Sequence, residues 1–136
     1  PRLVSSAASD VYKRQGLKPL DGNVALHQAC HSRAQNFGQK SAEMLNFIPD
    51  LSLHVIERCS GHGGSWGMMK DNFKTAIKVG KPAARQASKA NPKYVVSGCP
   101  LAGEHILQGI DFLGGSDKRP KNANHPIEIL AKAYNL

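Results

Sequence analysis

The stretch ERCSGHGGSWG, residues 57–67, holds one thiol, one imidazole, the only tryptophan and four glycines. It follows an alternating apolar run, residues 51–56, and precedes a helix-like run that starts near Lys70. Glycines give up much conformational entropy when a loop becomes ordered. Such a loop therefore indicates that its backbone comes close to something, such as a metal cluster, a phosphate or another chain. An ordinary flexible surface loop is the alternative interpretation.

Outward from this loop, short strand patterns alternate with helical ones. Hydrophobic periodicity predicts strands over residues 23–29, 51–56 and 94–97, and helices over residues 32–47, 70–90, 101–112 and from Pro126 to about Tyr134. Gly80 and Pro82 predict a break or kink in the second helix. The order β-α-β-α-β-α-α predicts a small three-layer α/β domain with a short, mostly parallel sheet.

The chain of 136 residues is long enough for one domain, and its 40% hydrophobic residues can supply a core. Residues 1–15 have no periodicity and begin without methionine, so we interpret them as non-native translated sequence or a disordered tail. Residues 16–136 then form a single domain. We expect this domain to be the C-terminal fragment of a longer protein.

The chain is basic, with a formal net charge of +8. Six cations at helical spacing form one stripe: Lys70, Lys74, Lys78, Lys81, Arg85 and Lys89. The stripe is either a solvated outer face or a docking site for an acidic partner or an anionic surface. Binding to nucleic acid is a weak alternative, because no DNA- or RNA-binding signature is present. No apolar run reaches the ~18 residues that span a bilayer.

Each of the three cysteines, Cys30, Cys59 and Cys99, lies a few residues after a predicted strand. The carboxyl ends of parallel strands share one edge of a sheet, where ligands bind. We therefore expect the three thiols to gather at this edge, close to the imidazoles of His31, His62 and His105. An odd number of cysteines without a CxxC motif argues against a disulfide framework and indicates a reducing, cytoplasmic setting.

Clustered thiolates suit zinc, copper(I) and iron–sulfur clusters. A Cys3His zinc site with His62, His31 or His105 remains open. The glycine-rich loop favours an iron–sulfur cluster, because Gly61, Gly63 and Gly64 let backbone N–H groups approach its sulfurs. In the alternative interpretation the cysteines are small buried apolar side chains without a ligand.

At Cys30-His31, Cys59-Ser60-Gly61 and Cys99-Pro100-Leu101-Ala102 the chain resembles the cysteine-rich CCG domain. That domain occurs in the B subunit of heterodisulfide reductase and in the C subunit of anaerobic glycerol-3-phosphate dehydrogenase. The chain resembles the glycerol-3-phosphate dehydrogenase subunit more strongly, and the resemblance is to the C-terminal repeat of that subunit. The family pattern has further cysteines where this chain has Ser60 and Ala102, so the resemblance favours one 4Fe-4S cluster over a pair of non-cubane clusters.

The resemblance implies an electron-transfer module of a respiratory oxidoreductase. It implies a flavin dehydrogenase partner, a ferredoxin-like domain and a quinone or other electron carrier, with possible peripheral association at the inner face of the cytoplasmic membrane. His62 or His105 is then the fourth cluster ligand or a hydrogen-bond donor beside it. Two alternatives stay open: a zinc- or thiol-dependent enzyme that uses Cys59 and His62, and a degenerate scaffold repeat without a cluster.

Overall fold

The computed structural model describes residues 16–35 and 39–136. The predicted tail over residues 1–15 and the middle of the predicted helix 32–47 lie outside the described residues. The elements are, in chain order, β1 (Val24–His27), α2 (Cys30–Ala34), α3 (Lys40–Leu45), β2 (Leu53–Ile56), the 3-10 turn η1 (Trp66–Met68), α4 (Phe73–Lys89), β3 (Tyr94–Ser97), α5 (Pro100–Phe112), the 3-10 turn η2 (Ser116–Lys118) and α6 (Pro126–Ala133).

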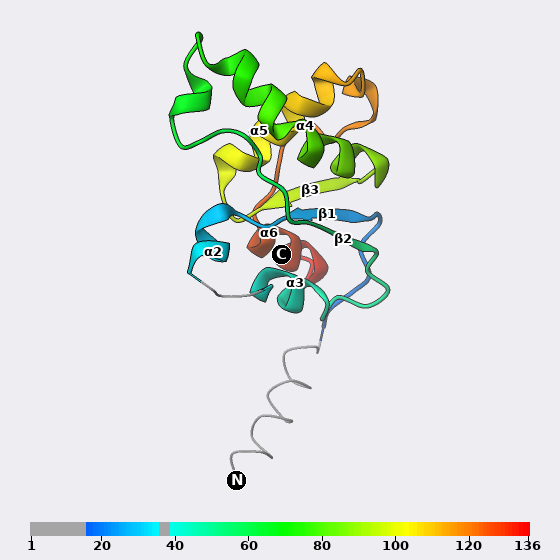
Figure 1. Ribbon diagram of the computed structural model, residues 1–136. Coiled ribbons are helices and arrows are strands. Elements are labelled where there is room, and N and C mark those ends of the chain that lie inside the picture. The colour runs from blue at the N-terminus through cyan, green and yellow to red at the C-terminus, as the bar shows by residue number, and fades with distance from the viewer. Residues whose placement is uncertain (1–15, 36–38) are drawn as a thin grey trace.

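The three strands form one parallel sheet in the order β2-β1-β3 (Figure 1). All four residues of β1 are buried, because this strand lies in the middle of the sheet with helices on both faces. The last residues of the strands are paired across the sheet, with His27 between Ile56 and Ser97. The predicted α/β class with a parallel sheet is confirmed.

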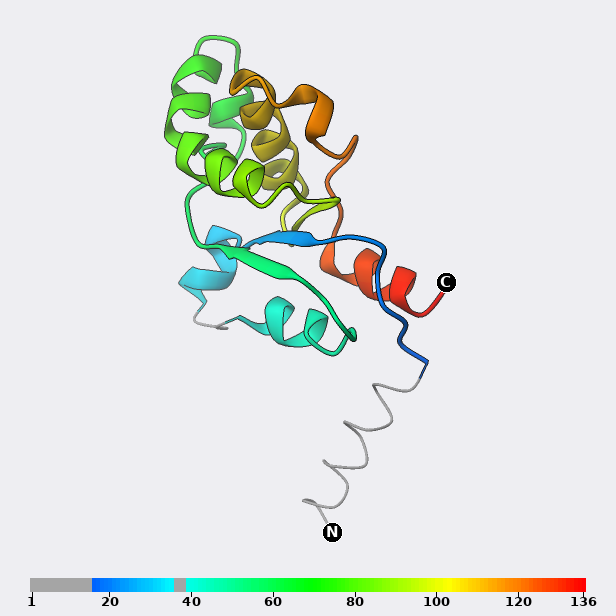
Figure 2. The ribbon, with the colours of Figure 1, turned by 90° about the vertical axis from the view of Figure 1, so that its right-hand side faces the viewer.

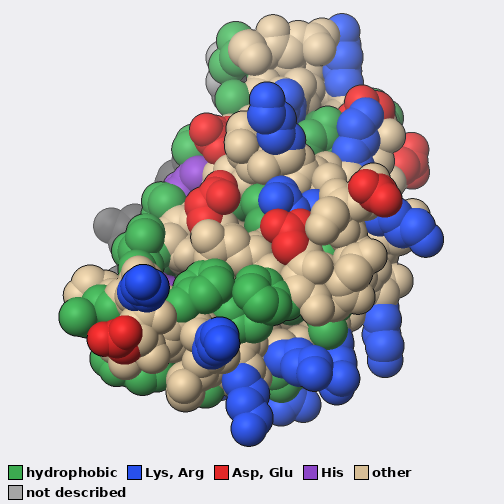
Figure 3. All heavy atoms as spheres, turned by 90° about the horizontal axis from the view of Figure 1, so that it is seen from above, with side chains coloured by type: hydrophobic (Ala, Val, Ile, Leu, Met, Phe, Trp, Pro, Cys, Tyr) green, Lys and Arg blue, Asp and Glu red, His purple; other side chains and the backbone are tan. Residues whose placement is uncertain are grey.

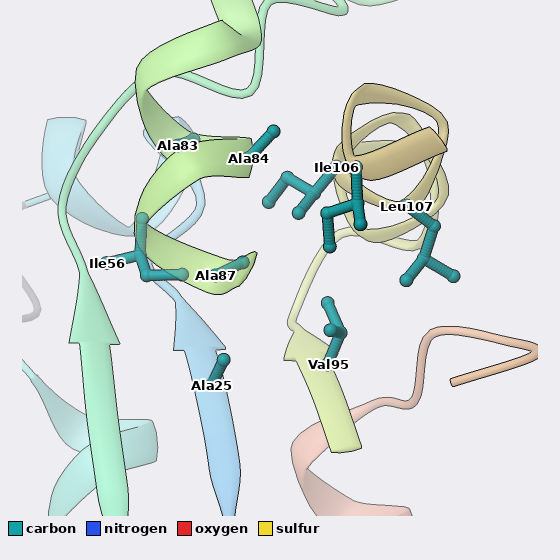
Figure 4. Packing of buried hydrophobic residues seen from close by; sticks show 9 residues of the cluster. Ala25, Ile56, Ala83, Ala84, Ala87, Val95, Ile106 and Leu107 are labelled. Atoms are coloured by element: carbon teal, nitrogen blue, oxygen red, sulfur yellow. The ribbon is translucent and has the colours of Figure 1, made fainter. Parts of the chain in front are cut away.

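The helices form the two outer layers. Helices α4 and α5 cover one face of the sheet, and α3 and α6 cover the other (Figures 1 and 2). Under α4 and α5 lies a core that alternates small and branched side chains (Figure 4): Ala25, Ile56, Ala83, Ala84, Ala87, Val95, Ile106, Leu107 and Ile110. The core of the opposite face includes Leu26, Leu45, Val96 and Ile129.

The single helix predicted over residues 32–47 is wrong. Helix α2 ends at Ala34, and α3 begins at Lys40 after the non-helical residue Gln39. The two helices differ in what they bury, since α2 buries none of its side chains whereas α3 buries Ala42 and Leu45. Without an apolar face, α2 does not have the packing that would continue it along the sheet.

Helix α4 is continuous through Gly80 and Pro82, so no break occurs there. Pro82 is on the exposed side, where water can satisfy the carbonyl group that loses its hydrogen bond. Position 80 requires glycine because the loop backbone passes close to it: a Cβ atom at this position would lie 2.1 Å from the carbonyl oxygen of Ser60. The absence of a side chain at Gly80 thus lets the glycine-rich loop pack directly against α4.

Within residues 16–35 and 39–136, every helix is too short or too polar to span a lipid bilayer.

Candidate metal centre

The three cysteines leave the sheet at its carboxyl edge. Cys30 is the first residue of α2, Cys59 lies in the loop after β2, and Cys99 is the N-cap of α5. Because neighbouring strands are about 4.8 Å apart, the three turns begin within about 10 Å of one another. The turn that carries Cys30 is in the middle, since β1 is the central strand.

Cys30 and Cys59 form the first pair of donors. Burial raises the pKa of the Cys30 thiol above its usual value, and the neighbouring Cys59 thiol adds to the shift. The backbone N–H of Gly61 donates to the Cys59 sulfur over 3.3 Å. Both cysteines are nonetheless exposed, so this pair lies at the surface of the edge.

Cys99 and His62 form the second pair. The Nε2 atom of His62 lies 3.8 Å from the Cys99 sulfur, and its Nδ1 atom lies 2.7 Å from the hydroxyl oxygen of Ser60. Burial lowers the pKa of His62, and the nearby His105 lowers it further. A neutral imidazole held in this way keeps one nitrogen lone pair for a proton or a metal. The structure therefore pairs His62 with Cys99, whereas the spacing of the sequence suggested a pair with Cys59.

The other two predicted imidazoles differ in position. His105 is buried in α5, and its Nδ1 atom donates to the backbone carbonyl of Ser60 over 2.5 Å. Its Nε2 atom has no partner in the described part of the chain, and the ring of Phe73 packs edge-on against it. His105 therefore lies behind the loop. His31 is exposed on α2, and its ring makes no hydrogen bond among the described residues.

The glycine-rich loop comes close to α4, as its composition indicated. Gly61 has φ +85°, and a Cβ atom there would lie 2.2 Å from the carbonyl oxygen of Ala76. Gly63 and Gly64 also have positive φ, of +53° and +65°, but no atom lies within 4 Å of a Cβ built at Gly64. Only Gly61 of these three is thus required by close backbone contact.

A buried polar pair lies under the edge and was not predicted from the sequence. The His27 ring hydrogen-bonds the Ser97 hydroxyl at 3.2 Å and the Arg58 carbonyl at 2.9 Å. The available signal was that the strands VALH and YVVS both end in a polar residue after an apolar run. That pattern does not tell whether the two polar residues meet.

The donor set fits an iron–sulfur cluster. Three thiols and one imidazole supply four ligands of the types that such clusters accept, and they come from the three turns that follow the strands at one edge of the sheet. The Gly61 N–H already donates to one of the sulfurs. Within residues 16–35 and 39–136, no three or more His, Cys, Asp or Glu side chains are gathered as one preformed ion site.

Known proteins similar to this chain are oxidoreductase subunits and iron–sulfur proteins. It is 30% identical over 125 residues to the C subunit of anaerobic glycerol-3-phosphate dehydrogenase from Escherichia coli K12, a match that covers 91% of this chain and 29% of the relative. It is 30% identical over 123 residues to the B subunit of fumarate reductase (CoM/CoB) from Methanothermobacter marburgensis, covering 88% and 24%. An uncharacterised iron–sulfur protein from Methanocaldococcus jannaschii is 32% identical over 119 residues, covering 85% and 24%. No protein-family model and no solved structure matches.

The α/β fold, the three cysteines at one edge and these relatives define the class: the chain is a homologue of oxidoreductase subunits and of iron–sulfur proteins. The similarity to the C subunit of anaerobic glycerol-3-phosphate dehydrogenase confirms the resemblance predicted from the cysteine motifs, and it is consistent with a CCG-type iron–sulfur domain and an electron-transfer module. The chain spans about 29% of that relative's length.

Proposed function

We propose that this chain is an electron-transfer module with one 4Fe-4S cluster at the carboxyl edge of its sheet. Cys30, Cys59 and Cys99 would hold the cluster, with His62 as the fourth ligand. One observation carries the proposal: three parallel strands end in register, and each is followed by a cysteine within three residues. When bound, the cluster would accept and release one electron at a time.

His62 is favoured over the other imidazoles by its contacts. Its Nε2 atom already faces the Cys99 sulfur, and the Ser60 hydroxyl holds its other nitrogen. A second hydrogen bond of this kind commonly orients a metal-ligating histidine. His105 would not bind the cluster itself. Its hydrogen bond to the Ser60 carbonyl would instead hold in place the loop that carries His62. His31 would lie at the exposed rim of the site.

Backbone N–H groups would set the potential of the cluster. Gly61 donates to the Cys59 sulfur, and a hydrogen bond to a ligating sulfur stabilises the reduced, more negative state. Gly63 and Gly64 follow in the same exposed loop and would leave room for the inorganic sulfides.

Electron exchange needs partners, which we propose from the relatives. A flavin dehydrogenase would reduce the cluster, and a ferredoxin-like domain or a quinone would take the electrons onward. The cations Lys74, Lys78, Lys81, Arg85 and Lys89 are exposed along α4, and none forms an ion pair within the described chain. Figure 3 views the molecule from this side and shows lysine and arginine side chains gathered towards one edge. This surface would attract an acidic partner or, in the cytoplasm, the inner face of the membrane.

Anaerobic metal analysis tests the proposal. The purified chain should contain iron and acid-labile sulfide and absorb broadly near 400 nm, and Cys59→Ala should lose both. His62→Ala should weaken or alter the cluster, whereas His54→Ala removes an exposed imidazole on β2 and should leave it unchanged. Purified wild-type chain that holds neither iron nor sulfide, even after reconstitution, would contradict the assignment and favour the scaffold alternative.

A thiol or zinc enzyme is the second candidate, and one observation favours it. Cys99, His62 and Ser60 form a line of thiol, imidazole and hydroxyl, in which a neutral His62 can accept a proton. Selective alkylation of Cys99, with Cys30 and Cys59 inert, would support this candidate. Stoichiometric zinc in place of iron would support its metal-dependent form.

A further inference from the structure

The side chain of His27 lies where the three cysteine-bearing turns begin. It is the last residue of the central strand, only 2% exposed, and it is paired with Ile56 on one side and Ser97 on the other. By strand alternation it faces α4 and α5, as Ala25 and Val95 do. An unsatisfied polar ring in such a place is costly, so the hydrogen bonds of His27 matter for the stability of this edge.

The directions of these hydrogen bonds are determined by the groups involved. A carbonyl oxygen only accepts, so the Nε2 atom of His27 donates to Arg58. Burial lowers the pKa of His27 and keeps the ring neutral, so Nδ1 is an acceptor for the Ser97 hydroxyl. The Ser97 oxygen in turn accepts from the backbone N–H of Cys99 over 3.2 Å.

These bonds form one directed chain, from the amide of Cys99 through Ser97 and His27 to the carbonyl of Arg58. It crosses all three strands at their carboxyl ends. One end is the backbone of Cys99, the other is next to Cys59, and the middle is on the strand that leads to Cys30. We infer that His27 is a positioning residue, which fixes the spacing of the three cysteine-bearing turns through Ser97 and Arg58.

The ligand-free chain tests this arrangement first. Nuclear magnetic resonance should find His27 neutral with its proton on Nε2 and the Cys99 amide protected from exchange. Ser97→Ala removes the acceptor for that amide, so its exchange should speed up on the order of tenfold. Ile129→Val, a buried change on the opposite face of the sheet, should not alter Cys99 exchange beyond any global loss of stability. A proton on Nδ1, or unchanged Cys99 exchange in Ser97→Ala, overturns the inference.

The second test, which rests on the proposed function, uses the chain reconstituted anaerobically with iron and sulfide. Ser97→Ala and His27→Ala should lower iron occupancy or shift the midpoint potential, and Ile129→Val should do neither. His27→Gln keeps an amide donor that can reach the Arg58 carbonyl, so its iron occupancy should be higher than that of His27→Ala. If His27→Ala does not fold, His27→Gln still tests the inference.

The two tests separate the two ideas. If the wild-type chain takes up no cluster, the proposed function fails, and the resonance experiment still decides whether the directed chain exists. If the cluster forms and Ser97→Ala and His27→Gln both match the wild type in iron content and potential, the positioning role is refuted.

Discussion

Gly61→Ala tests whether contact with α4 holds the glycine-rich loop in place. Two costs add. At φ +85° an alanine costs about 1–2 kcal/mol relative to glycine. Its Cβ would also lie 2.2 Å from the Ala76 carbonyl oxygen and 2.6 Å from the Gly80 nitrogen, and both are backbone atoms that cannot rotate away. Overpacking of this kind costs about 1–3 kcal/mol, so we expect a total loss of about 2–5 kcal/mol.

Gly64→Ala is the matched control, because it has a positive φ of +65° and open space around the added methyl group. It should lose only the backbone contribution, about 1–2 kcal/mol. Urea unfolding followed by circular dichroism measures both variants, and the transition midpoints should differ while the m-values agree. Equal midpoints for Gly61→Ala and Gly64→Ala would show that the loop yields freely, and the reasoning about close contact would then be wrong.

Three further predictions concern the core, an exposed ion pair and the first thiol pair. Ile129→Ala, at a fully buried position, should lower the free energy of unfolding by about 2–5 kcal/mol in the same urea assay. The Lys93 ammonium holds the pKa of Asp21 at about 2. The contribution of this carboxylate to the free energy of unfolding should therefore be complete above its usual pKa near 3.8 and should fade as the pH falls through about 2. A nuclear magnetic resonance titration that gives Asp21 an ordinary pKa contradicts this. The alkylation rate of Cys30 should reach its midpoint at a higher pH than that of a free thiol, and Cys59→Ala should lower that midpoint.

The three strands and their positions along the chain could be predicted from the sequence, because the signal is local. The run NVALHQA is mostly apolar, as expected for a central strand with helices on both faces. The run YVVS is short and contains β-branched residues. The right-handed crossover rule then places the turns after the strands at one edge. Thus the position of Cys30, Cys59 and Cys99 follows from chain order alone.

The details of the site depend on contacts across the sheet, which local patterns do not contain. Nothing in the spacing of residues tells that the His62 ring turns towards Cys99, because this depends on how the loop crosses α4 at Gly80. The pairing of His27 with Ser97 likewise requires the strand register. Helical periodicity over residues 32–47 also does not show where the predicted helix divides, because α2 and α3 have only five and six residues and a helical window covers both.

Ser60 connects the resemblance to the geometry of the site. It stands where the CCG pattern has a cysteine, and it is only 1% exposed. Its hydroxyl holds Nδ1 of His62, and its carbonyl accepts from His105. A ligating sulfur at this position could not hold an imidazole in the same way, so we expect the serine and His62 to act as a unit. The hydroxyl orients the ring, and the Nε2 atom beside the Cys99 sulfur would supply the coordination that a thiol at position 60 would otherwise provide. On this view the lost cysteine changes which atom binds iron and leaves the number of ligands for one cluster intact.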